Sequence, residues 1–123
     1  MTAAHELTIE VQHLETEGAV VVKVHGALDS QTYNALESKL DRLINHGEPK
    51  LIVDLSEVDY ITMAGVRVFI TARLKSTREH GGIVLLRISE HVENVLDMLQ
   101  LRGVLRIANS EAEALKMLET PQE

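Results

Sequence analysis

The chain has 123 residues, of which 45% are hydrophobic and 25% are charged, as is typical of one folded domain and not of a disordered or membrane-embedded protein. Its formal net charge is −7, from 12 Lys and Arg against 19 Asp and Glu. This balance argues against nucleic acid as the main partner, because phosphate binding needs a basic surface. The chain has no cysteine, which excludes disulfide bonds, thiolate zinc sites and a cysteine nucleophile.

The sequence shows no sign of export or of membrane insertion. No stretch approaches the roughly 20 apolar residues that span a bilayer. The opening residues, MTAAHELTIEVQ, lack the basic and apolar regions of a secretory signal. We therefore expect a cytoplasmic protein, folded as a single domain over residues 1–123.

The first third of the chain predicts a β-hairpin followed by a helix. Residues 7–14, LTIEVQHL, alternate apolar and polar side chains, and residues 19–26, AVVVKVHG, are rich in β-branched side chains. A short turn that ends in glycine separates them. Asp29 and Ser30 are suited to cap a helix that continues to about His46.

The middle of the chain alternates buried strands with a helix. Residues 51–55, LIVDL, indicate a central strand that is covered on both faces. A helix is expected over about 65–80, ended by Gly81-Gly82. Residues 83–88, IVLLRI, predict another buried strand.

The last third predicts a helix, a strand and a final helix. Ser89 is suited to cap a short helix, and residues 104–108, VLRIA, indicate a short strand. Ser110 and Glu113 have the spacing of a capping box at the start of the last helix. The order is therefore β-β-α-β-α-β-α-β-α. We expect an α/β domain with four helices and a mixed, mostly parallel β-sheet.

The sequence offers little for catalysis or metal binding. Its six histidines form no H-x-x-x-H or H-E-x-x-H pair, and no nucleotide-binding or serine-hydrolase motif occurs. We expect no catalytic residue, no metal site and no cofactor.

Asp54, at the end of a buried strand, is comparable with the phospho-accepting aspartate of a phospho-relay receiver. The carboxylates and lysine that should accompany it are not in place, so a receiver or a small-ligand binder is kept only as an alternative.

Residues 59–65, DYITMAG, join the central strand to the following helix. Thr62 is placed to cap that helix by accepting a hydrogen bond from the N–H of Ala64 or Gly65. Gly65 allows another backbone to approach closely. The helix then carries more apolar positions than one core-facing stripe holds, so part of it either packs beneath neighbouring elements or forms a partner surface. These positions are Val66, Val68, Phe69, Ile70, Ala72 and Leu74.

Several segments together resemble the STAS domain, the fold of bacterial anti-sigma-factor antagonists. They are G-A-L-D at 26–29, LIVDLSEVDYI at 51–61, Gly65, Gly81-Gly82 and LDMLQL at 96–101. The resemblance extends over about residues 7–118 and matches the predicted order of elements. It implies a non-enzymatic binding module, which binds an anti-sigma factor of the serine-kinase type in a partner-switching pathway and so frees a sigma factor.

Members of this family are typically switched off by phosphorylation of a serine in a D-S-[ST]-G motif at the start of the second helix. Aligned with T-M-A-G at 62–65, that motif places the family serine at Met63 and the family aspartate at Thr62. Met63 has no hydroxyl, so the usual switch cannot operate there. Either the domain stays competent to bind, or it is a scaffold for another system, such as a lipid-transport ATPase or a stress-signalling complex. Thr62 is the alternative, displaced phospho-acceptor.

The resemblance predicts a partner surface centred on the strand-to-helix junction and on the nearby Asp29 region. An anti-sigma factor is the expected partner, and a homodimer is left open. The predicted contact residues are Asp29, Tyr60, Thr62, Met63, Ala64, Gly65, Val66 and Arg67.

Overall fold

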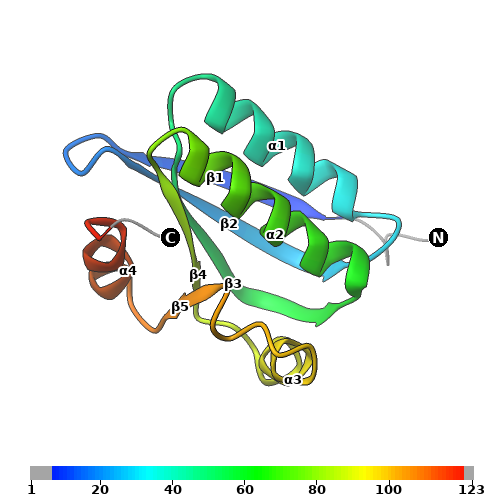
Figure 1. The fold of residues 1–123 in the computed structure, drawn as a ribbon. Helices are drawn as coiled ribbons and strands as arrows, with labels where there is room; N and C mark the ends of the chain where they lie inside the picture. The colour runs from blue at the N-terminus through cyan, green and yellow to red at the C-terminus, as the bar shows by residue number, and fades with distance from the viewer. Residues whose placement is uncertain (1–6, 121–123) are drawn as a thin grey trace.

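The computed structural model describes residues 7–120, which form five strands and four helices in the predicted order (Figure 1). Residues 1–6 and 121–123 of the predicted domain lie outside the described residues. The strands are β1 (Thr8–Leu14), β2 (Ala19–Leu28), β3 (Lys50–Ile61), β4 (Gly82–Leu86) and β5 (Arg106–Ala108). The helices are α1 (Tyr33–Asn45), α2 (Met63–Arg78), α3 (Glu90–Met98) and α4 (Glu111–Leu118).

The strands form a single mixed sheet in the order β1-β2-β3-β4-β5. β1 pairs antiparallel with β2, as the predicted hairpin requires, and the three other pairs are parallel. The prediction of a mixed, mostly parallel sheet is therefore confirmed. β3 lies at the centre, and its residues 51–55 are all buried, which explains why this segment lacks an exposed polar side.

β3 is much longer than the apolar run at 51–55 that predicted it. Beyond that run the strand continues to Ile61 through two irregularities in its pairing with β2. Lys23 pairs with Asp54, but His25 pairs with Glu57, so β3 carries an extra residue at each irregularity. These bulges interrupt the alternation of apolar and polar residues. A strand predicted from this alternation alone therefore ends too early. The STAS resemblance, which includes residues 51–61, gives the correct end.

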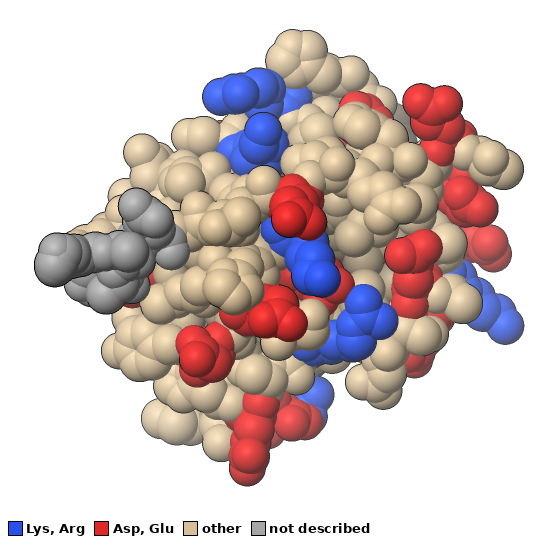
Figure 2. Space-filling model, turned by 180° about the vertical axis from the view of Figure 1, so that it is seen from behind, with Lys and Arg blue, Asp and Glu red and all other residues tan. Residues whose placement is uncertain are grey.

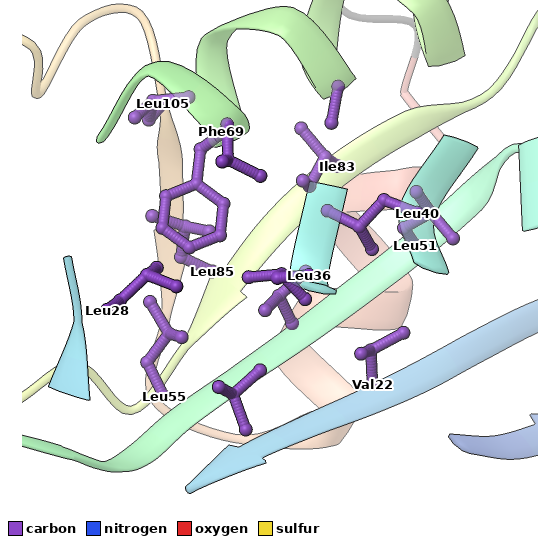
Figure 3. Close-up of a cluster of buried hydrophobic side chains, with 14 of the residues drawn as sticks. Val22, Leu28, Leu36, Leu40, Leu51, Leu55, Phe69, Ile83, Leu85 and Leu105 are labelled. Carbon is purple, nitrogen blue, oxygen red and sulfur yellow. The ribbon is translucent and has the colours of Figure 1, made fainter. Parts of the chain in front are cut away.

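Helices cover the two faces of the sheet unequally. α1 and α2 lie side by side over one face (Figure 1). α3 adds Val92 and Leu96 to the same core cluster, whereas α4 packs through Ala114 and Leu118 on a separate cluster of the opposite face. Figure 3 shows Phe69, the single phenylalanine of the chain, pointing from α2 into the larger cluster.

The predicted start of α1 is two to three residues too early. Asp29 and Ser30 do not cap the helix, because α1 begins at Tyr33 with Thr32 in the N-cap position. Asp29 instead closes a turn before the helix: its Oδ1 accepts hydrogen bonds from the N–H groups of Gln31 and Thr32, at 2.9 and 3.1 Å. An aspartate favours both local arrangements, so the sequence does not distinguish them.

The predicted end of α2 is also two residues too late. The helix ends at Arg78, and His80, not a glycine, adopts the left-handed conformation with φ of 68°. Gly81 is needed for a different reason: a Cβ there would lie only 2.1 Å from the carbonyl oxygen of Pro49. This close approach lets the N–H of Gly82 donate to the same carbonyl, at the point where β4 joins the sheet beside β3.

We predict that Phe69→Ala lowers the free energy of unfolding by about 3–5 kcal/mol, because it empties a fully buried position at the contact of α2 with the sheet. Leu74→Ala on the same helix is the matched control, since Leu74 is about half exposed and should cost less than about 1 kcal/mol. Urea denaturation followed by circular dichroism measures both values. Equal losses for the two variants would contradict this description of the core.

Candidate partner-binding site

The first turn of α2 is held against the ends of two parallel strands. The N–H of Thr62 donates to the carbonyl of Leu28 at the end of β2, at 3.0 Å. A Cβ added at Gly65 would lie 2.8 Å from that same carbonyl oxygen, and 2.8 Å from side-chain atoms of Leu28 and Ile61. The predicted close approach at Gly65 is therefore present, and the partner backbone is that of β2.

This contact leaves three predicted residues exposed around the junction. Tyr60, near the end of β3, is 49% exposed, and Met63, the first residue of α2, is 52% exposed. Arg67 lies one helical turn after Met63 and is also exposed. The junction therefore presents an aromatic ring, a thioether and a guanidinium to solvent. Large apolar side chains in such exposed positions are enriched at protein–protein interfaces.

His91, near the start of α3, completes this group of side chains. Its ring stacks on that of Tyr60, with centroids 5.1 Å apart and the ring planes inclined by 16°. Its Nε2 lies 3.4 Å from the carbonyl oxygen of Ile61. The stack links α3 to the end of β3. No local pattern in the sequence singles out this histidine, because the partner of a ring stack is set by tertiary structure.

The hydroxyl of Thr62 does not make the predicted capping bond. Thr62 occupies the N-cap position with an extended backbone, but its side chain accepts no hydrogen bond from the helix. Its Oγ1 is buried and has no hydrogen-bond partner among residues 7–120. A kinase could therefore reach this oxygen only if the start of α2 moved.

The structure brings all eight predicted contact residues to the same end of the sheet, but it gives them different roles. Gly65 and Val66 are buried and fix the position of the helix. The side chains available for direct contact are Tyr60, Met63 and Arg67, and partly exposed positions surround them. These partly exposed positions are Asp29, Thr62 and Ala64.

The carboxylate of Asp54 is held by hydrogen bonds within the protein. One carboxylate oxygen accepts a hydrogen bond from the N–H of Ser56, and the other pairs with Nη2 of Arg87, both at 3.0 Å. Burial raises the pKa of Asp54, but the hydrogen bonds from Ser56 and Arg87 together lower it by more, so the net pKa lies below its ordinary value. Both oxygens are engaged, which gives no support to the receiver alternative.

On the face of the sheet opposite α1 and α2, the part that α4 leaves uncovered is polar. Figure 2 shows basic and acidic side chains interleaved on this side, without a continuous basic area. A hollow of about 340 Å³ on the sheet is lined entirely by polar or charged residues, which gives little support to a small-ligand site. These residues are Thr8, Glu10, Lys23, His25 and Glu57. Across residues 7–120, no group of three or more His, Asp or Glu side chains is placed to hold a metal ion.

Comparison with known proteins shows what the chain is similar to. The family model described as the STAS domain matches residues 10–114. The chain is 27% identical to BtrV of Bordetella bronchiseptica, described as a candidate anti-sigma factor antagonist, over 85% of this chain and 90% of that protein. It is also 27% identical to the anti-sigma F factor antagonist of Paenibacillus polymyxa, over 92% of this chain and 96% of that protein.

A solved structure gives the same fold. The anti-sigma factor antagonist of Mycobacterium paratuberculosis superposes with a TM-score of 0.84 at 22% identity, covering 98% of this chain and all of that one. Within the part of the chain that the structure describes, no helix is long and apolar enough to cross a membrane.

We predict that Gly65→Ala destabilises the protein by about 1–3 kcal/mol, because the new Cβ would displace the start of α2 from the backbone of Leu28. Gly103→Ala is the matched control, since a Cβ there meets no atom within 4 Å. Its effect should stay within about 0.5 kcal/mol. Denaturant midpoints measure both changes, and a neutral Gly65→Ala would show that the close contact does not hold the junction.

We predict that Asp54→Asn lowers stability by about 1–2 kcal/mol at neutral pH, because it removes a charged hydrogen-bond acceptor from a buried site. The lowered pKa of Asp54 means that its stabilising effect is complete above about pH 5 and is lost as the pH falls through and below about 3.9. The difference between the two proteins should therefore shrink in acid. Unfolding free energies measured from pH 7 to pH 3 check this, and a constant difference would contradict it.

Proposed function

The chain belongs to the STAS domain family, and from that premise we propose that it is a non-enzymatic, cytoplasmic anti-sigma factor antagonist. It binds an anti-sigma factor of the kinase type and so releases a sigma factor. Two relatives described as antagonists, both aligned over most of their length, support this role. The single observation that carries the proposal at the site is the exposed apolar pair Tyr60 and Met63, at the junction where the family carries its regulatory serine.

We further propose that the bound state is not reversed by phosphorylation at this junction. Met63 and Ala64 have no hydroxyl, and the hydroxyl of Thr62 is buried. A phosphoryl group would add about −1.5 to −2 charges and three strong acceptor oxygens to this surface. Met63 instead presents a flexible, polarisable side chain, which suits contact with an apolar partner surface. The module therefore stays competent to bind while ATP and the kinase are present.

The test measures binding to the anti-sigma factors of the source genome by calorimetry, with Met63→Asp as the diagnostic variant. We expect the affinity of Met63→Asp for the anti-sigma factor to fall at least about tenfold, equivalent to about 1.4 kcal/mol. The reason is that a carboxylate would have to be desolvated in an apolar contact. An aspartate at the start of a helix is favourable to folding, so reduced stability would not explain the loss. Met98→Asp is the matched control, because Met98 is exposed on α3.

A kinase assay in the same mixture tests the regulatory part. With ATP present, the natural chain should remain unmodified at positions 62–64 by mass spectrometry, and Met63→Ser should become phosphorylated and dissociate. Phosphate on Thr62 of the natural chain would contradict the proposal. Failure to bind any anti-sigma factor, together with copurification of a transport ATPase or stress-signalling complex, would favour the scaffold alternative instead.

A further inference from the structure

α2 differs in charge from the rest of the chain. It contains four basic residues and no Asp or Glu, in a protein whose net charge is −7. Lys75 is neutralised by Asp41 of α1, with Nζ and Oδ1 2.9 Å apart, and Arg73 is partly buried with an interaction of its own. The side chains of Arg67 and Arg78 are exposed, and within residues 7–120 neither side chain makes a hydrogen bond or an ion pair. α2 therefore presents two uncompensated guanidinium groups.

These two arginines alternate with apolar side chains along one face of α2. Met63 and Leu74 are each 52% exposed, and Ile70 is partly exposed. Positions 63, 67, 70, 74 and 78 follow the spacing of three or four residues that places side chains on one helical face. We call this set the outer α2 stripe: Met63, Arg67, Ile70, Leu74 and Arg78. It spans about 22 Å at 1.5 Å per residue.

We propose that the outer α2 stripe binds an acidic amphipathic helix of the partner, with carboxylates facing Arg67 and Arg78 and apolar side chains between them. This inference rests on the proposed function, because Met63 belongs to both surfaces. It extends the contact along the whole length of α2, well past the junction. Opposite charges around an apolar centre would speed association and fix the register of the two helices.

The narrow width of the apolar strip on α2 favours an acidic protein segment over an anionic membrane. A membrane-surface helix inserts a continuous apolar face, whereas Val66, Val68 and Phe69 of α2 are buried in the core and only the apolar residues of the stripe remain at the surface. A partner helix needs only a narrow strip of the kind that the stripe offers.

The probe is a synthetic four-turn peptide, held helical by a lactam bridge on its far face, with leucines and glutamates spaced to match the stripe. Titrated into the isotope-labelled full chain, it should shift the amide signals of residues 63–78. The double variant Arg67→Glu with Arg78→Glu should weaken binding at least tenfold, and added salt should weaken it as well. Lys116→Glu on α4 is the matched control and should bind normally, because Lys116 is exposed away from the stripe.

Several outcomes would overturn the inference. The first is that millimolar peptide shifts no amide signals of the chain, or shifts only those of another surface. The second is that a peptide with lysine in place of glutamate binds equally well. The third is that the chain binds phosphatidylglycerol vesicles in preference to the peptide. A dimer of the free chain that Arg67→Glu dissociates would show that a second copy occupies the stripe, which also overturns it. Because the peptide assay contains no anti-sigma factor, its failure leaves the binding role of Met63 intact. Conversely, a chain that binds the peptide but no anti-sigma factor would contradict the proposed function and leave the inference about the stripe standing.

Discussion

The contact between the first turn of α2 and the end of β2 determines where every exposed residue of the proposed site lies. The contact exists because Gly65 has no Cβ, which would otherwise lie 2.8 Å from the carbonyl oxygen of Leu28. The N–H of Thr62 donates to that carbonyl and fixes the entry of the helix. Held in this way, Met63 is half exposed three residues after Tyr60, whose ring stacks on that of His91 in α3.

The site is suited to binding and offers little for chemistry. Asp54, the buried carboxylate of the central strand, is occupied by Arg87 and Ser56. The hydroxyl of Thr62 is enclosed, and Met63, at the position that we propose for the family's phospho-acceptor, has no hydroxyl. The accessible surface consists of Tyr60 and the outer α2 stripe, which begins at Met63. Under the proposed function, such a domain would be controlled by how much of its complex forms, and phosphorylation at the junction would not switch it off.

The sequence predicts the order of elements, the mixed sheet and the close approach at Gly65, because these depend on local periodicity and on small residues. It fails where tertiary contacts decide. The two bulges lengthen β3 beyond its apolar run, Asp29 closes a turn without capping α1, and the hydroxyl of Thr62 is buried without capping α2. The Tyr60–His91 stack and the Asp54–Arg87 pair each join residues more than 30 positions apart, so no local pattern reveals them.

The proposed function requires that the partner binds at the β3–α2 junction and not on the open face of the sheet. Hydrogen exchange of the full chain, with and without a bound anti-sigma factor, tests this most directly. We expect new protection in residues 60–67 and unchanged exchange in β1. Protection of β1, with residues 60–67 exchanging as in the free chain, would contradict it.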